Sequence, residues 1–212
     1  MDISQKYRLF IDYFEQNMPM AETELVYEAP YELLVAVILS AQCTDKRVNM
    51  LTPAFFETFP DAMALSQANN EDVFDKIKSC SYPNNKTKNL IGMAKTLVER
   101  FGGVVPSEVE KLMELPGVGR KTANVVASVV FEKPAMAVDT HVFRVSARIG
   151  LTQNARNPLQ AEQQLVAYIP EKLIHKAHHW LILHGRYVCK ARKPSCTECR
   201  LQNICDFYQS GK

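Results

Sequence analysis

The sequence lacks several features that would place it in whole classes of protein. Its longest apolar run, residues 33–39, is far shorter than the roughly 20 residues needed to cross a bilayer. The first ten residues carry charges throughout and have no continuous apolar core of the kind found in secretory signals. We therefore expect a cytoplasmic protein with no membrane partner.

Strand-like alternation, internal repeats and low-complexity tracts are also missing. Apolar residues instead recur at three- and four-residue steps, as on one face of a helix. A Ser-x-x-Glu capping box at Ser107 and Glu110 adds a helix start, and Gly102 adds a helix stop. We expect an all-α fold of roughly ten helices at average length. The predicted helices span residues 3–14, 31–42, 90–101, 107–113, 157–168 and 173–184, with another starting at 44–45 and interrupted or kinked near Pro53.

Charge and cysteine content are more informative locally than in total. A net charge of +2 is too mild to establish a polyanionic partner. In a reducing compartment the six cysteines are better read as ligands or buried thiols than as disulfides. Four of them follow the spacing C-x6-C-x2-C-x5-C, which admits zinc or an iron–sulfur cluster and favours the latter, because zinc sites usually pair two C-x-x-C units. Cys43 and Cys80 fall outside this pattern, and we expect them to be buried small hydrophobes.

A glycine-containing turn is predicted between two helices, from Leu115 to Thr122. Gly117 and Gly119 permit backbone angles closed to other residues and leave the turn amides unshielded. Free amides at the start of the second helix favour an anion such as phosphate, and Arg120 and Lys121 add positive charge there. Taken alone, the pattern also fits a tight helix–helix turn with two exposed basic residues.

Asp139 precedes another apolar-periodic segment. The simplest interpretation is a helix N-cap that accepts a backbone hydrogen bond.

Three motifs together resemble one family. The string from Leu115 to Asn124, the segment Val138-Asp139-Thr140-His141 and the four-cysteine spacing are similar to those of endonuclease III, a helix-hairpin-helix base-excision DNA glycosylase with a [4Fe–4S] cluster. The resemblance extends from about residue 23 to 207. It implies two helical domains with a DNA cleft between them: a six-helix domain at 22–132, and a cluster domain formed by 1–21 and 133–212.

The resemblance also implies a chemistry. Lys121 would attack C1′ of a flipped-out damaged nucleotide, form a Schiff base and cut the strand 3′ to the site by β-elimination, with Asp139 as the assisting carboxylate. Only about one free lysine in a few thousand is neutral at pH 7. Partial burial, Arg120 and the helix N-terminus are the features expected to raise that fraction.

Further roles follow from the same resemblance. Gln42 would fill the gap left in the duplex, while Ser40, Asp45 and His141 would line the lesion pocket. The segment 81–86 departs from the family pattern, and Tyr82 would replace its aliphatic wedge. His175, His178, His179 and His184 would serve packing and hydrogen bonding. The cluster would be held by Cys189, Cys196, Cys199 and Cys205, and the other DNA contacts would be Gly117, Val118, Gly119, Arg120, Lys121, Thr122, Arg186, Lys190, Arg192 and Lys193.

The implied partner is double-stranded DNA containing oxidised pyrimidines or abasic sites, bound by a monomer in the bacterial nucleoid. Two alternatives remain. Relatives that remove mismatched adenine lack the lysine and carry a glutamate where this chain has Val37. A non-catalytic, cluster-bearing DNA-binding module would bind DNA without cutting it.

Overall fold

The computed structural model describes residues 1–211, and these residues are helical wherever they are regular. They form twelve α-helices and two short 3₁₀ helices, without a strand, which confirms the expected all-α class. None of the described helices is both long and apolar enough to span a membrane. The chain separates into two compact units: Thr23–Phe131, and Met1–Glu22 together with the chain from Glu132 onward.

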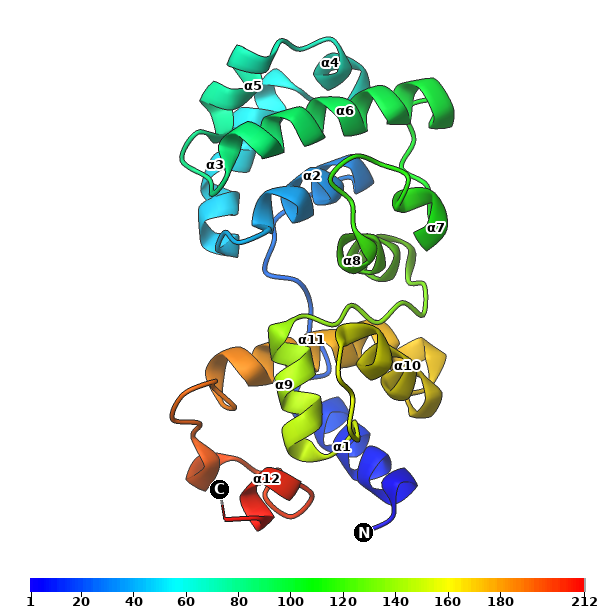
Figure 1. The fold of residues 1–212 in the computed structure, drawn as a ribbon, viewed down its shortest axis with the longest axis vertical. Coiled ribbons are helices and arrows are strands. Elements are labelled where there is room, and N and C mark those ends of the chain that lie inside the picture. Colours follow the sequence, from blue (N-terminus) through cyan, green and yellow to red (C-terminus); the bar gives the residue numbers. More distant parts are fainter. Residues whose placement is uncertain (212) are drawn as a thin grey trace. The chain divides into compact units, whose positions relative to one another are not determined.

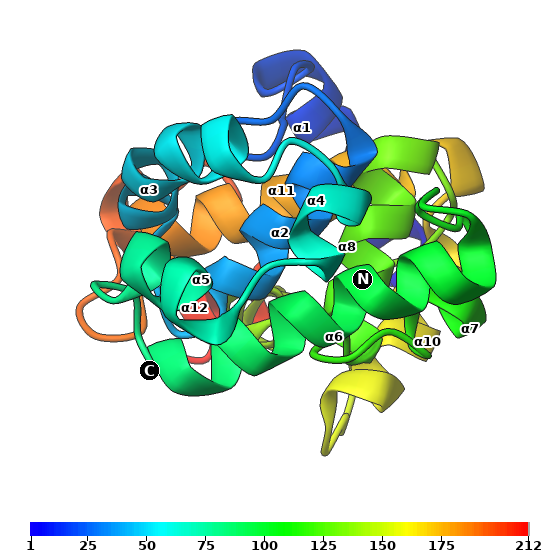
Figure 2. The same ribbon diagram turned by 90° about the horizontal axis from the view of Figure 1, so that it is seen from above.

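The unit Thr23–Phe131 is built around one helix that is buried on nearly all sides. Every residue of α2 from Leu33 to Leu39 is buried, which explains why this segment shows no polar face. Figure 2 shows α2 in the middle of the unit, where it packs against α3, α6 and α8. The long helix α6 is covered by α4 and α5 (Figure 1). The helices of this unit are α2 Pro30–Ser40, α3 Asp45–Thr58, α4 Ala62–Ser66, α5 Asn70–Ile77, α6 Pro83–Phe101, α7 Val109–Leu112 and α8 Arg120–Phe131.

Local sequence signals set most helix ends in this unit. Gly102 adopts φ 60° and ends α6, as predicted. Two expectations were wrong in detail. Helix α3 begins at Asp45 as predicted, after the N-cap Thr44, whose hydroxyl accepts from the Arg47 amide, but it continues through Pro53 without interruption. The capping box does not form, because α7 starts one residue later than its pattern requires, after Glu108, and has no side-chain cap.

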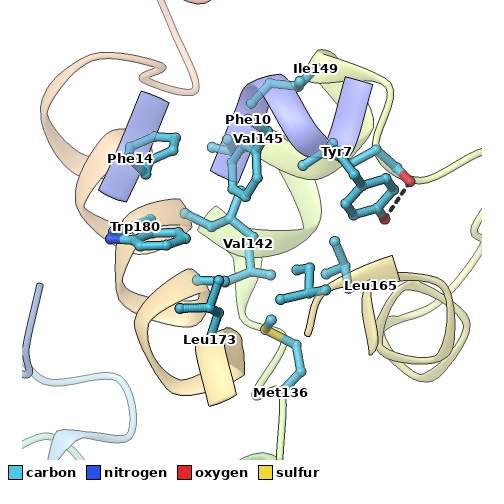
Figure 3. Close-up of a cluster of buried hydrophobic side chains, with 14 of the residues drawn as sticks. Tyr7, Phe10, Phe14, Met136, Val142, Val145, Ile149, Leu165, Leu173 and Trp180 are labelled. Atoms are coloured by element: carbon cyan, nitrogen blue, oxygen red, sulfur yellow. Dashed lines mark hydrogen bonds between the residues drawn. The ribbon is translucent and has the colours of Figure 1, made fainter. Parts of the chain in front are cut away.

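The second unit joins both ends of the chain in one core. Figure 3 shows Phe10 and Phe14 of α1 beside Trp180 of α11, and the Phe14 and Trp180 rings stack with centroids 5.6 Å apart. The Trp180 indole donates to the Met18 carbonyl at 2.8 Å. This core makes α1 integral to the unit. Its helices are α1 Ile3–Asn17, α9 Thr140–Ile149, α10 Pro158–Tyr168, α11 Ile174–Tyr187 and α12 Asp206–Gln209, with 3₁₀ helices at Glu171–Leu173 and Cys196–Glu198.

A buried lysine completes the connection between the chain ends. Lys6 is only 6% exposed, and its Nζ contacts Asp206 Oδ1 at 2.5 Å and the Ile149 carbonyl at 3.0 Å. One side chain thereby joins α1 to the end of α9 and to α12. Removing it would leave Asp206 without its cation and the Ile149 carbonyl without this donor.

Candidate functional site

The turn before α8 is built around one strained glycine. Gly117 adopts φ 79°, and a Cβ placed there would lie 2.8 Å from Cβ of Asn89 on α6. Only glycine fits, for both reasons. The Val118 side chain is buried, and its amide donates to the Leu115 carbonyl at 3.0 Å. The turn is therefore a rigid part of its unit.

Gly119 has a different environment from Gly117. Its φ is not positive, so of the two glycines only Gly117 uses the left-handed backbone angles that glycine permits. A Cβ added at Gly119 would meet no atom within 4 Å. Its carbonyl accepts the hydrogen bond from the Ala123 amide, which places Gly119 just before the first turn of α8. The fold does not require a glycine here, but a partner approaching the first amides of α8 meets no side chain.

Lys121 lies in that first turn with an exposed side chain. The expected partial burial was wrong, because the buried face of α8 begins only at Ala123. Arg120 beside it and Thr122 after it complete the turn. Among the described residues, the Lys121 amine makes no hydrogen bond or ion pair, so it is available to a bound molecule.

Asp139 is the N-cap of α9. Its Oδ1 accepts from the amides of His141 and Val142, each at 2.8 Å. Both bonds use the same oxygen. Within residues 1–211 the second oxygen, Oδ2, has no hydrogen-bond donor, and the side chain is half-buried. The carboxylate is thus held in place through one oxygen and presents the other.

The residues predicted to line a lesion pocket are distributed over both units. Ser40 ends α2 and donates to the Val37 carbonyl at 2.9 Å, and Asp45 is the first residue of α3. His141 belongs to the other unit, where its Nδ1 lies 3.2 Å from a guanidinium nitrogen of Arg144. Any added Cβ at Gly185 would approach the His141 side chain to 2.9 Å, so α11 packs closely against this imidazole.

Gln42 and Tyr82 lie on two neighbouring corners of the unit Thr23–Phe131. Each has a left-handed backbone, with φ 55° and 54°, which is uncommon for residues other than glycine. The Ser81 hydroxyl donates to the Gln42 carbonyl at 2.6 Å and joins the two corners. Both side chains are exposed, and 63% of Tyr82 is accessible. Two exposed side chains are thus carried on adjacent, conformationally strained corners.

The Lys86 ammonium supports these corners, and sequence reasoning did not find it. Lys86 is 5% exposed, and its Nζ donates to the carbonyls of Leu39 and Ala41 at 2.7 and 2.8 Å. Those carbonyls belong to the end of α2, where a cation is favourable. In the sequence, Lys86 lies in the first turn of a helix that starts at Pro83, where a lysine is expected to be exposed. Nothing in the sequence therefore indicated its contacts with the end of α2.

The four predicted cysteine ligands surround one pocket. His184 and Leu201 also line it. Burial raises the pKa of the Cys199 and Cys205 thiols, and the neighbouring cysteines raise it further because thiolates repel one another. A cation inside the pocket would reverse that repulsion. Nowhere in the described chain do three Cys, His, Asp or Glu side chains converge on a point that suits a single ion. The lining cysteines are Cys189, Cys196, Cys199 and Cys205.

Two arginines of α9 hold the first part of the cysteine loop, and neither was predicted. Arg148 donates to the Cys189 sulfur at 3.5 Å and to the carbonyls of Lys190 and Ala191 at 2.8 and 3.0 Å. Arg144 donates to the Cys189 carbonyl at 3.2 Å. Around this loop Lys190, Arg192 and Lys193 are exposed, whereas Arg186 is half-buried. A spacing of four between Arg144 and Arg148 was a signal that both lie on one helix face.

Three histidines of α11, His178, His179 and His184, are buried, as their expected packing role requires. His178 and His179 are buried side by side, and His178 Nδ1 lies 2.8 Å from the Ala137 carbonyl. Burial, followed by the charges of His178 and His175, lowers the pKa of His179 to about 3. Burial lowers the pKa of His184 to about 4, and its Nε2 lies 3.6 Å from the Cys199 sulfur.

Comparison with known proteins identifies the family to which this hairpin belongs. Residues 35–171 match the HhH-GPD superfamily of base excision DNA repair proteins, which is well over half of the chain. The chain belongs to this superfamily. As an HhH-GPD protein it is an enzyme, a DNA glycosylase of base excision repair.

Individual relatives confirm the resemblance to endonuclease III. The chain is 47% identical over 197 residues to endonuclease III of Rickettsia felis, covering 93% of this chain and 92% of the relative. Endonuclease III of Escherichia coli K12 is 42% identical over 194 residues, with 92% of each chain covered. A trapped covalent intermediate of endonuclease III with DNA has the same fold, with a TM-score of 0.93 and 41% identity over all of this HhH-GPD chain and 99% of the other.

Proposed function

We propose that this chain is a bifunctional DNA N-glycosylase and abasic-site lyase that removes oxidised pyrimidines from duplex DNA. The observation that carries the proposal is the exposed Lys121 amine in the first turn of α8, beside amides that no side chain covers at Gly119. A lysine nucleophile forms a Schiff base with a sugar aldehyde, and β-elimination then cleaves the strand 3′ to the site. A relative 41% identical to this chain is known as a covalent intermediate with DNA, which supports an attacking side chain of this kind.

Asp139 is proposed as the carboxylate that assists Lys121. Its Oδ1 is occupied by two amides, while Oδ2 has no donor among residues 1–211. Such a group can stabilise positive charge developing on the sugar and accept a proton without losing its capping bonds. The cap orients the carboxylate, so the structural and catalytic roles are compatible.

Gln42 and Tyr82 are proposed to replace the flipped nucleotide in the duplex. C1′ of a stacked nucleotide is inaccessible to a side chain, so the nucleotide must leave the helix at a cost of a few kcal/mol. Two exposed side chains on rigid neighbouring corners suit this role, because little of their order has to be created during binding. Ser40, Asp45 and His141 are proposed to contact the extruded base.

Phosphate binding is proposed at two places. The hairpin would hold the backbone through the amides that follow Gly117 and Gly119 and through Arg120, Lys121 and Thr122, which positions DNA without reading sequence. The exposed Lys190, Arg192 and Lys193, with Arg186, would form a second contact. We propose that the two compact units act as a helix-hairpin-helix domain and a cluster domain, and that each contributes contacts to one DNA duplex.

The pocket at Cys189, Cys196, Cys199 and Cys205 is proposed to hold a [4Fe–4S] cluster. All four thiols line it, which fits a four-cysteine cofactor. In a zinc site each sulfur lies about 2.3 Å from one metal, so the sulfurs converge tightly. The chain has only one C-x-x-C unit among its four cysteines, whereas zinc sites usually pair two, which favours the cluster. The cluster would order a loop that contributes little to the hydrophobic core. We expect a monomer that works in the cytoplasm on chromosomal DNA.

Borohydride trapping tests the nucleophile. The protein is incubated with duplexes carrying either thymine glycol or an abasic site, reduced, and analysed for protein–DNA adducts. We expect adducts with wild type and with the control Lys95→Ala, which removes an exposed lysine on α6, and none with Lys121→Ala. Equal adducts with Lys121→Ala would disprove the assignment. Binding without adducts in every protein would favour the non-catalytic module, and release of mismatched adenine would favour the other alternative.

Asp139→Asn separates the two roles of Asp139. The asparagine Oδ1 still accepts the two amides, so the melting temperature should change little. Base release should fall by about 10² or more, because the negative charge is lost. Single-turnover kinetics on the thymine glycol duplex measure this, and unchanged base release would leave Asp139 as a cap only.

A further inference from the structure

Two cysteines outside the cluster pocket lie next to each other in the unit Thr23–Phe131. Cys43 follows α2 and Cys80 follows α5, so the two residues are far apart in sequence. The Cys80 thiol donates to the Leu39 carbonyl at 3.3 Å. The Ser81 hydroxyl donates to the Gln42 carbonyl at 2.6 Å, and this bond between the chain neighbours of Cys80 and Cys43 holds the two segments side by side. Cys80 is buried, as expected, but Cys43 is partly exposed, so the interpretation of both as buried hydrophobes was wrong for Cys43.

The surroundings of this thiol pair suit thiol chemistry. Lys86 Nζ lies 3.3 Å from the Cys80 sulfur, while also bonding the carbonyls of Leu39 and Ala41. Burial and Cys43 raise the pKa of Cys80, and Lys86 acts in the opposite direction. The partly exposed Cys43 thiol is therefore the one that a dissolved reagent can reach. The buried Cys80 thiol lies beside the Lys86 ammonium.

We propose that Cys43 and Cys80 form a reversible disulfide by exchange with a low-molecular-weight disulfide such as oxidised glutathione. The Cys43 thiolate attacks one glutathione sulfur, which forms a mixed disulfide and releases one reduced glutathione. The Cys80 thiolate then attacks the Cys43 sulfur and releases the second. Two protein thiols and one oxidised glutathione become one protein disulfide and two reduced glutathiones, so electrons and protons balance.

The bond would join the two corners that carry Gln42 and Tyr82. Cys43 follows Gln42, and Cys80 precedes Ser81, whose hydroxyl already holds the Gln42 carbonyl. A disulfide sets the two sulfurs about 2.05 Å apart, which would fix the separation of the corners. In a reducing cytoplasm the thiols stay free, and the bond forms only when oxidised glutathione accumulates. This inference rests on the position of the two thiols and does not require the proposed function.

Peptide mapping tests the bond directly. The intact cluster-bearing protein is equilibrated anaerobically in glutathione buffers of increasing oxidised fraction, acid-quenched, alkylated and digested with trypsin. We expect a disulfide between peptides 9–46 and 79–86 that disappears with dithiothreitol. Because a cross-link restricts the unfolded chain, the melting temperature should rise by several degrees in the same samples.

Cys43→Ser is the matched control, since it changes a partly exposed residue and leaves Cys80 in place. It should fold normally, form no linked peptide and show no rise in melting temperature with oxidised glutathione. Stable glutathionylation of Cys43 without the linked peptide would overturn the proposal. So would a linkage of either cysteine to the cluster cysteines, or two thiols that remain free in the most oxidising buffer.

Discussion

The hairpin before α8 and the loop from Cys189 to Cys205 are both proposed to contact DNA, but they are held in different ways. Packing and backbone geometry hold the hairpin: Gly117 fits against Asn89, and Val118 is buried. Arginine side chains and a pocket of thiols hold the cysteine loop. A short turn can thus be ordered by packing within its own unit, whereas a longer loop with few buried apolar residues depends on polar contacts such as those of Arg144 and Arg148.

Of the changes considered, low pH should produce the largest difference in stability between the two units. All five histidines lie in the unit that carries the cysteine loop, and Thr23–Phe131 has none. Burial and neighbouring histidines lower the pKa of His179 to about 3, whereas an unfolded histidine titrates near 6.5. Below about pH 6.5, His179 binds a proton in the unfolded state but stays neutral in the folded state. The free energy of unfolding therefore decreases as the pH falls toward 3. The loss for His179 reaches on the order of 3 kcal/mol at pH 4.

Hydrogen exchange across pH 7 to 4 measures this difference. We expect amides of α9 and α11 to lose protection at a higher pH than amides of α2 and α6. His179→Gln should reduce the pH dependence of the first group only. Loss of protection in both groups at one pH, unchanged by the substitution, would contradict the assignment.

Glycine-to-serine substitutions at Gly117 and Gly119 test the different roles of the two residues in the hairpin. Gly117→Ser should destabilise the protein by about 2 kcal/mol or more, because it combines a left-handed backbone with a clash against Asn89. Gly119→Ser should change stability by less than about 0.5 kcal/mol, because space is open there and serine is a good N-cap. It should nevertheless weaken DNA binding about tenfold by covering the first amides of α8.

Urea unfolding and binding to an abasic-site analogue duplex measure the two effects. If Gly119→Ser binds DNA as tightly as wild type, the open space at Gly119 has no role in phosphate binding. If Gly117→Ser is as stable as wild type, the hairpin is less rigid than its packing indicates.

Arg148→Met should have the smallest effect, and it concerns the cysteine loop. The methionine removes the donor to the Cys189 sulfur and the two carbonyl contacts, so iron should be lost to a chelator several-fold faster. The reduction potential of the cluster should also fall, because a hydrogen bond to a ligand sulfur stabilises the reduced state. Arg192→Met is the control, since Arg192 is exposed in the same loop. Equal rates of iron loss from both variants would show that Arg148 does not stabilise the proposed cluster.

Much of the fold was predictable because its signals are local. The helix predicted over 157–168 is present as α10, Pro158–Tyr168, and α6 ends at Gly102 as predicted. The capping box at Ser107 failed because the helix starts one residue later, although the same residues are present. Competing local caps differ by small energies, so packing decides between them.

In the candidate site, too, residues in short motifs were predictable and residues that contact distant segments were not. Motif residues such as Lys121, Asp139 and the four cysteines were selected from sequence, since each belongs to a short string with a recognisable spacing. Lys86, Arg144 and Arg148 were not, because their contacts join segments far apart in the chain. The neighbouring thiols of Cys43 and Cys80 were missed for the same reason.

By itself, the sequence determined the helical class, the superfamily and the short motifs, because periodicity and spacing act over a few residues. Only the tertiary structure decided that Gly117 is sterically required while Gly119 is open, that a buried lysine holds the Gln42 corner, and that four thiols surround one pocket. Those properties depend on which distant segments pack together, and the free energy of packing is a property of the whole unit.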